Sequence, residues 1–200
     1  TPTTTERNTP LQISITDGRG KTTTATPALT IVEPKTMSAS SGSTCAITPA
    51  GSIECWGRNN VGQLGDGTTD NSSYPVPVLN LKGRAISVTV GIDHACALLS
   101  TGNVQCWGDN SAGELGTGDT LSSSAPADAD ITSAVSIVAG MNFTCATLRD
   151  GTASCWGIGT YGQIGNGSSE NVSAPTAVSG LANVIDVEAG GSHACEIGRA

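Results

Sequence analysis

The sequence has few aromatic and few charged side chains. Its 200 residues include one Phe, two Tyr and three Trp, and only 13 % are Asp, Glu, Lys or Arg. No run of about 18 apolar residues occurs, so we expect no membrane insertion. The 17 acids outnumber the nine bases, and the net charge of −8 argues against nucleic acid as a partner.

Glycine, by contrast, is abundant. The 26 glycines are spread along the chain rather than placed in triplets, which indicates many turns and excludes both collagen and a mostly helical protein. With 37 % hydrophobic residues the chain can bury a core, which disfavours wholesale disorder.

The seven cysteines are regularly spaced. A separation of ten alternates with separations of 41, 39 and 40, which gives a repeat of about 50 residues; the positions are Cys45, Cys55, Cys96, Cys106, Cys145, Cys155 and Cys195. A period of this length is typical of solenoids, propellers and arrays.

Other motifs recur in step with the cysteines. A glycine follows the first cysteine of each pair by six residues, and the second cysteine opens a Cys-Trp-Gly triplet. Glycine-rich loops follow at residues 62–67, 113–118 and 162–167, and a proline stands 19 residues after each tryptophan, at Pro75, Pro126 and Pro175.

Each repeat contains patterns that predict four strands. In the second repeat, residues 86–90 alternate, 95–99 form a short apolar run, and 104–107 follow a Thr-Gly-Asn turn. A weaker fourth strand is expected just after each proline, at 76–79, 127–131 and 176–178, where an edge position loses no ladder donor. Four-stranded antiparallel units repeated in this way predict an all-β fold of propeller blades.

The ten-residue spacing of the cysteines predicts disulfides. If the hairpin folds about its glycine, the two cysteines of each pair lie opposite each other, close enough to be bridged. The expected bonds are Cys45–Cys55, Cys96–Cys106 and Cys145–Cys155, with Cys195 unpaired. Three disulfides would indicate an oxidising compartment. Free buried thiols and a zinc site are the alternatives, although zinc prefers Cys-x₂₋₄-Cys spacing.

These motifs together resemble the regulator of chromosome condensation repeat family. The pattern is His-x-Cys-Ala-Leu, a turn glycine, Cys-Trp-Gly and then Gly-Gln-Leu-Gly-x-Gly, and it covers about residues 38–200. The resemblance implies a seven-bladed propeller, of which this chain would hold a part: three blades at about 37–85, 86–134 and 135–184, and an incomplete fourth at 185–200. The remaining blades would belong to the same polypeptide. The paired cysteines are similar to those of the bacterial, exported branch of the family, which implies an extracellular or cell-surface location.

Residues 1–36 differ from the repeats, because they hold 12 Thr and no Cys or Trp. Residues 11–16, a turn at 17–20 and the Thr-rich sequence that runs to residues 29–32 predict a β-hairpin similar to the end of a bacterial immunoglobulin-like module. A Thr-rich linker is the alternative.

Several residues that suggest chemistry are better explained by structure. His94 and His193 share a repeat position with Ser43 and Phe143, which indicates packing rather than catalysis. The glycine-rich loops lack the Lys of a nucleotide site. Segment 66–70 resembles a calcium loop, but the other two repeats have no acidic residue in place of Asp66. We therefore expect no enzyme activity, no cofactor and no metal.

The function we expect is recognition by loops at the rim of the blades, because the residues after each Trp-Gly vary on a constant frame. The candidate residues are Arg58, Asn59, Asn60, Asp109, Asn110, Ser111, Ile158, Thr160 and Tyr161. The leading hypothesis is a non-enzymatic extracellular module that binds a protein or glycan. The alternatives are nucleotide exchange on a small GTPase with chromatin docking, as in the eukaryotic branch of the family, and inhibition of an extracellular enzyme, as in similar propeller-type β-lactamase inhibitors.

Overall fold

The structure is a computed structural model that describes residues 13–16, 22–25 and 36–198. The chain divides into two units, Thr1–Val32 and Glu33–Ala200. In the first unit, β1 (Ile13–Thr16) pairs antiparallel with β2 (Thr22–Ala25). This confirms the predicted N-terminal hairpin, whose second strand lies in the Thr-rich sequence that follows the turn. Residues 29–32, to which the prediction extended that sequence, lie outside the described residues.

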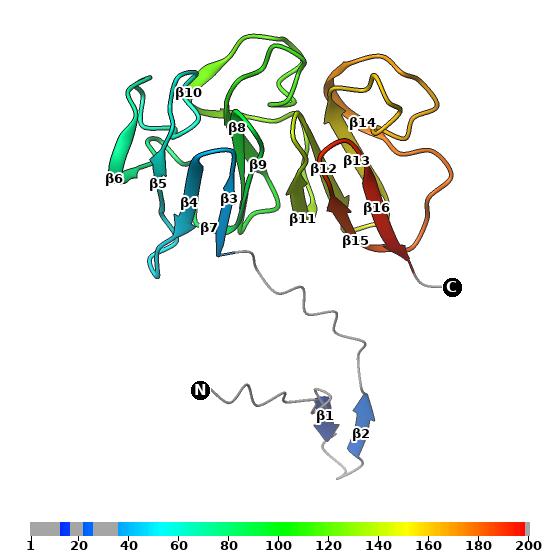
Figure 1. The fold of residues 1–200 in the computed structure, drawn as a ribbon. Helices are drawn as coiled ribbons and strands as arrows, with labels where there is room; N and C mark the ends of the chain where they lie inside the picture. The colour runs from blue at the N-terminus through cyan, green and yellow to red at the C-terminus, as the bar shows by residue number, and fades with distance from the viewer. Residues whose placement is uncertain (1–12, 17–21, 26–35, 199–200) are drawn as a thin grey trace, which may run out of the picture. The chain divides into compact units, whose positions relative to one another are not determined.

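The second unit contains three four-stranded antiparallel sheets, each with its strands in sequence order (Figure 1). Blade 1 comprises β3 (Met37–Ser40), β4 (Ser43–Ile47), β5 (Ile53–Gly57) and β6 (Ser72–Pro77). Blade 2 comprises β7 (Ala85–Val90), β8 (His94–Leu99), β9 (Val104–Gly108) and β10 (Ser123–Asp128). Blade 3 comprises β11 (Ala134–Ala139), β12 (Phe143–Leu148), β13 (Ala153–Gly157) and β14 (Val172–Ala177), and a two-stranded sheet of β15 (Val184–Ala189) and β16 (Ala194–Gly198) follows it. The predicted all-β class and four-stranded blades are confirmed.

The fourth strand of each blade differs from the prediction. It begins three residues before the proline rather than after it, so Pro75 lies inside β6, and Pro126 and Pro175 lie inside β10 and β14. The register shifts between Cys55 and Gly57, which pair with Val76 and Ser72, and the other two blades have the same irregularity. A strand at a sheet edge with such a bulge needs no donor from the proline, which is why the strand continues through it.

The hydrophobic core lies between neighbouring blades. Alternate residues of β8 belong to different clusters: Ala95, Ala97 and Leu99 pack toward blade 1, while Cys96 and Leu98 pack toward blade 3. All six residues of β8 are buried. The apolar runs in β8 and β12 are therefore explained by burial of both of their pleated faces, which one blade alone cannot provide.

The blades contact each other at both ends. At one end, the turn glycines Gly51, Gly102 and Gly151 accept backbone hydrogen bonds at 2.8–3.0 Å from the first residue of the next sheet. Those first residues are Ala85, Ala134 and Val184, each one residue before the expected repeat boundary. The long loops between the third and fourth strands lie at the opposite end (Figure 1). Among the described residues, no helix is long and apolar enough to cross a bilayer.

Candidate functional site

A disulfide joins the two middle strands of each blade. Cys45–Cys55, Cys96–Cys106 and Cys145–Cys155 are directly opposite in register, with Cα atoms 4.0–4.1 Å apart. Closing a ring of this size contributes about 2.5 to 3 kcal/mol in the chain-entropy treatment. Cys195, in β16, is free and exposed.

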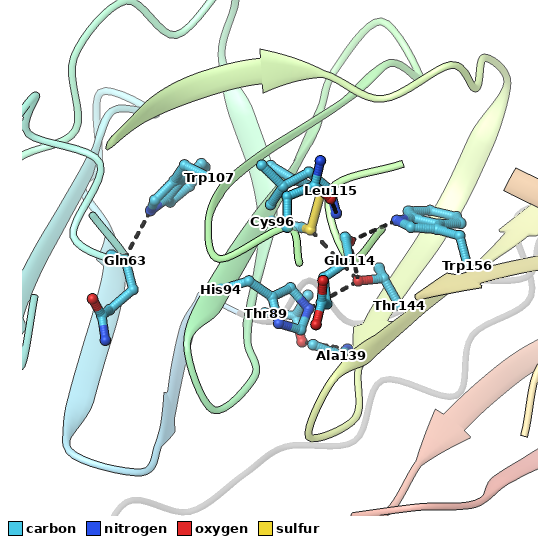
Figure 2. Close-up of a disulfide and its surroundings, with 12 residues drawn as sticks. Gln63, Thr89, His94, Cys96, Trp107, Glu114, Leu115, Ala139, Thr144 and Trp156 are labelled. Atoms are coloured by element: carbon cyan, nitrogen blue, oxygen red, sulfur yellow. Dashed lines mark hydrogen bonds between the residues drawn. A yellow bond between two sulfur atoms is a disulfide. The ribbon is translucent and has the colours of Figure 1, made fainter. Parts of the chain in front are cut away.

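Each buried tryptophan contacts the glycine-rich loop of the preceding blade (Figure 2). The indole Nε1 of Trp107 donates to the carbonyl of Gln63 at 3.0 Å, and that of Trp156 donates to the carbonyl of Glu114 at 2.8 Å. Both side chains are fully buried. Trp107 and Trp156 therefore connect successive blades.

In the first two loops, the central glycine makes room for the indole. At Gly65 and Gly116, a Cβ would lie only 2.8 Å from Nε1 of Trp107 and Trp156 respectively, and φ is +70° at both. No residue with a side chain fits this position without displacing the indole. We call the loop carbonyl and this glycine an indole site: Gln63 and Gly65 form the first, Glu114 and Gly116 the second. The third loop supplies Gln163 and Gly165.

A hydrogen-bonded network surrounds the second indole site (Figure 2). Nε2 of His94 lies 3.0 Å from the hydroxyl of Thr144, which donates to the carbonyl of Glu114 at 3.1 Å. Burial lowers the pKa of His94 to about 4, although Asp109 acts in the opposite direction. His94 is thus a neutral, interblade packing residue at neutral pH, whereas His193, at the same repeat position, is exposed.

The side chain of Glu114 caps its own loop. Its carboxylate accepts from the backbone N–H of Ala112 at 2.9 Å, as Gln63 and Gln163 accept from Val61 and Tyr161. Burial raises the pKa of Glu114, and hydrogen bonds with backbone and with Asn142 only partly offset this. The carboxylate occupies a position where the neighbouring blades carry a neutral amide.

Two candidate recognition residues are buried. Asn59 and Asn110 are fully inaccessible, so the structure corrects their predicted role as contacts for a partner. The Nδ2 group of Asn59 faces four acceptors at 3.0–3.2 Å, and its Oδ1 accepts from the N–H of Leu64 at 2.8 Å. Asn110 makes the equivalent set of contacts. A loop can follow this curved path because one amide satisfies its inward-facing carbonyls.

The calcium-like segment 66–70 is explained by the same amide. Its inward oxygens, from Asp66, Thr68 and Asp70, surround Nδ2 of Asn59. No group of three or more His, Cys, Asp or Glu side chains in the described part of the chain is placed to hold a metal ion.

The remaining candidate residues are at least partly accessible. Arg58, Asp109 and Ile158 are half-buried, and Arg58 forms an ion pair with Asp93 at 3.2 Å. The exposed ones are Asn60, Ser111, Thr160 and Tyr161. The structure therefore brings these side chains to one end of the blades, around the buried amides.

Sequence reasoning missed one highly exposed residue of the loops, Leu121, and selected another, Tyr161. Leu121 is 74 % exposed at the tip of the second loop, and a lone leucine in a polar loop gave no signal. Tyr161 is 79 % exposed and lines a pocket beside Gly165, whereas its counterpart Ala112 is buried. The high exposure of Tyr161 is therefore a property of the third indole site.

Comparison with known proteins assigns the repeats. Two models of the regulator of chromosome condensation (RCC1) repeat match, one at residues 51–98 and 150–197 and the other at 85–114 and 134–163. Together they match more than half of the 200 residues.

Curated relatives match over short regions. The human E3 ubiquitin-protein ligase HERC2 is 36 % identical over 112 residues, which are 47 % of this chain and 2 % of HERC2. The ultraviolet-B receptor UVR8 of Arabidopsis thaliana is 37 % identical over 82 residues, 40 % of this chain and 19 % of UVR8. The chain thus spans less than a fifth of either relative.

Two solved structures share the fold. Human WBSCR16 superposes with a TM-score of 0.73 at 22 % identity, covering 82 % of this chain and 44 % of WBSCR16. Prp20p of Saccharomyces cerevisiae gives 0.72 at 19 % identity, covering 92 % of this chain and 53 % of Prp20p. With the blades, the Cys-Trp-Gly strands and the glycine-rich loops, these matches show that the chain belongs to the RCC1 repeat family and carries part of its propeller scaffold.

Proposed function

We propose that the chain is a non-enzymatic recognition scaffold of an oxidising, extracellular environment that binds a protein or glycan through three recognition loops. These loops are residues 58–71, 109–122 and 158–171. The observation that carries the proposal is the contrast, in the first two loops, between the buried amides of Asn59 and Asn110 and exposed side chains such as that of Leu121.

Fixed loops favour binding because little conformational entropy is lost when a partner is engaged. Asn59 and Asn110 each hold their loop by five hydrogen bonds from the inside. The exposed tips then differ from blade to blade: Asn60, Ser111 and Leu121, and Thr160. A constant frame with variable tips is the usual arrangement of a recognition surface.

The charge of the loops favours a neutral or basic partner. Among accessible side chains the three loops carry one cation, Arg58, against five acids: Asp66, Asp70, Asp109, Asp119 and Glu170. This balance disfavours the phosphate backbone of a nucleic acid.

A binding experiment on the loop tips tests the proposal. The chain is screened against immobilised secreted proteins and glycans, and each ligand is measured again with an Asn60→Ala and Leu121→Ser double variant. We expect the variant to lose at least about tenfold in affinity, since exposed anchors dominate such interfaces. Met37→Ser is the matched control, because Met37 is 65 % exposed but lies on β3, toward the turn end of blade 1. A ligand lost with Met37→Ser and kept with the loop variant would refute the proposal.

Thiol titration tests the compartment. In protein taken from its native host and denatured without reductant, a thiol-alkylating reagent should leave Cys45, Cys55, Cys96, Cys106, Cys145 and Cys155 unmodified, because these six cysteines are paired. Alkylation of all six would indicate a reducing compartment and contradict an extracellular role.

Nucleotide exchange is the alternative to exclude. The solved structure of Prp20p was described together with its binding to Gsp1p and histones, and at 19 % identity that likeness concerns the fold alone. We expect no acceleration of nucleotide release from a small GTPase by this chain. Acceleration would overturn the proposal.

A further inference from the structure

Four asparagines of the chain begin an Asn-x-Ser/Thr triplet, the acceptor sequence for N-linked oligosaccharides on surface loops of secreted proteins. They are Asn71, Asn142, Asn166 and Asn171. A glycosylated asparagine carries a bulky sugar chain on its side-chain nitrogen, so that nitrogen has to face solvent. The structure divides the four asparagines into two pairs by this criterion.

Asn71 and Asn171 occupy the same position in blades 1 and 3, directly before the fourth strand. Both residues are exposed. Oδ1 of Asn71 accepts from the backbone N–H of Asn59 at 2.7 Å, and Oδ1 of Asn171 accepts from the N–H of Gly159 at 3.1 Å. In both blades the loop therefore holds the oxygen side of an exposed amide.

The counterpart of these residues in blade 2, Ser122, shows that the position stays accessible between complete neighbours. Ser122 is exposed although blades 1 and 3 lie on either side of its own blade. Its hydroxyl accepts the equivalent backbone bond, from the N–H of Asn110, at 3.1 Å. The structural task at this position thus needs only an oxygen acceptor, and a serine performs it as well as an asparagine.

The hydrogen bond to Oδ1 leaves the amide nitrogen for an oligosaccharide. Nδ2 of Asn71 and Nδ2 of Asn171 donate no hydrogen bond within the described part of the chain. An asparagine that is glycosylated at Nδ2 keeps its carbonyl oxygen, so it can still accept from the N–H of the loop. The loop path and an attached sugar are therefore compatible at both positions.

Asn142 and Asn166 lie in different surroundings, and both are half-buried. The two residues that complete the first of these triplets, Phe143 and Thr144, are buried between blades 2 and 3, and the Thr144 hydroxyl belongs to the network in Figure 2. Oδ1 of Asn166 accepts from the N–H of Ser168 at 2.9 Å, which folds that triplet into a turn. Neither triplet presents an exposed asparagine.

We propose that Asn71 and Asn171 carry N-linked oligosaccharides in the exported protein, and that Asn142 and Asn166 do not. The inference rests on the extracellular location proposed above. In the transfer, Nδ2 attacks the anomeric carbon of an oligosaccharide that is linked to a polyisoprenyl pyrophosphate. A C–N bond forms, the C–O bond to the pyrophosphate breaks, and the pyrophosphate leaves with the electron pair and takes up the proton that the amide loses.

Mass spectrometry of protein from its native host tests the proposal. Cleavage after Lys, Arg and Glu places the four triplets on separate peptides, 59–82, 115–149, 150–170 and 171–188. We expect peptides 59–82 and 171–188 to be heavier by the mass of an oligosaccharide. The other two should have their unmodified mass once the disulfide between Cys145 and Cys155 is reduced.

The state of the cysteines separates this inference from the proposed function. If the six blade cysteines are paired and either peptide 59–82 or peptide 171–188 is unmodified, this inference is overturned and the proposed function stands. If the cysteines are reduced and the asparagines unmodified, both are overturned. Equal modification of all four triplets would overturn the selection by exposure.

Two serine substitutions locate the modification in blade 1. Ser73→Ala removes the third residue of the triplet but keeps Asn71 and its hydrogen bond, so peptide 59–82 should lose the added mass. Ser73 is exposed, so the substitution leaves the fold intact. Ser72→Ala is the matched control, because the triplet accepts any middle residue except proline, and it should retain the added mass. An added mass that survives Ser73→Ala, or that disappears in Ser72→Ala, would overturn the assignment to Asn71.

Discussion

The interface between blades 2 and 3 and the edge that follows blade 3 carry the same sequence motifs in different surroundings. At the interface, Trp156 fills the second indole site and His94 is buried against Thr144. At the edge, the third indole site opens into a pocket, and His193 is exposed. Ala112 is buried at the interface, whereas its counterpart Tyr161 is exposed at the edge.

This difference shows that a single repeat does not bury its own apolar side chains. The core clusters combine residues from adjacent sheets, so blades 2 and 3 each contribute to two cores. Stability in such an array is the sum of repeat and nearest-neighbour contributions. A motif therefore stabilises the fold only where the neighbouring sheet covers it.

The largest expected effect contrasts two tryptophans. Trp156→Ala removes a fully buried indole and its hydrogen bond, and should lower the free energy of unfolding by about 3–5 kcal/mol. Trp56→Ala, at a half-buried position, should cost about 1–2 kcal/mol. Urea unfolding followed by circular dichroism measures both. Equal losses would contradict the nearest-neighbour description.

Acid stability should distinguish the two histidines. Because the pKa of folded His94 is lowered to about 4, the unfolded chain binds more protons between that pH and the ordinary value of 6.5, so stability falls as pH falls through this range. His94→Phe, which introduces the residue found at position 143, should reduce that loss by roughly 3 kcal/mol. Unfolding midpoints at several pH values measure it, and His193→Phe, the same substitution at the exposed equivalent position, is the control. A wild-type pH dependence in His94→Phe would contradict the burial argument.

Two glycines of the second loop should respond differently to alanine. Gly116→Ala places a methyl group against Trp156 and should cost about 1–3 kcal/mol more than Gly118→Ala. Gly118 also has a positive φ but has no atom within 4 Å of a Cβ, so it reports backbone strain alone. Thermal unfolding of the two variants measures the difference, and similar losses would show that strain, not the indole, explains the glycine.

The smallest effect concerns the charge at position 114. Glu114→Gln introduces the amide found at positions 63 and 163, and should raise stability at neutral pH by about 1 kcal/mol, since a buried charge is replaced by a neutral group. Because the pKa of Glu114 is raised in the folded chain, the wild type loses stability as pH rises above the ordinary value, and the gain should vanish below about pH 4. A gain that is independent of pH would contradict this cause.

Much of the fold could be predicted from spacing. The cysteine separation of ten predicted cross-strand disulfides, because a hairpin folded about its glycine fixes which residues are opposite. The predicted positions of the proline-containing strands were wrong by a few residues. Proline was expected to mark the start of each strand because it lacks a backbone donor, but at a sheet edge with a bulge no hydrogen bond is lost.

The site was less predictable for a physical reason. Asn59 and Asn110 stand among variable loop residues in the sequence, and only the curved path of the loop turns their side chains inward. Similarly, Leu121 becomes noticeable only through the exposure of its side chain in the folded loop.

The sequence by itself determined the strands, their pairing and the disulfides, because these depend on local alternation, turns and spacing along the chain. Only the tertiary structure decided which copy of each repeated residue is buried: His94 but not His193, Ala112 but not Tyr161. Copies of one motif lie in different environments because the burial of each copy depends on the sheet beside it. The motif itself does not specify that neighbouring sheet.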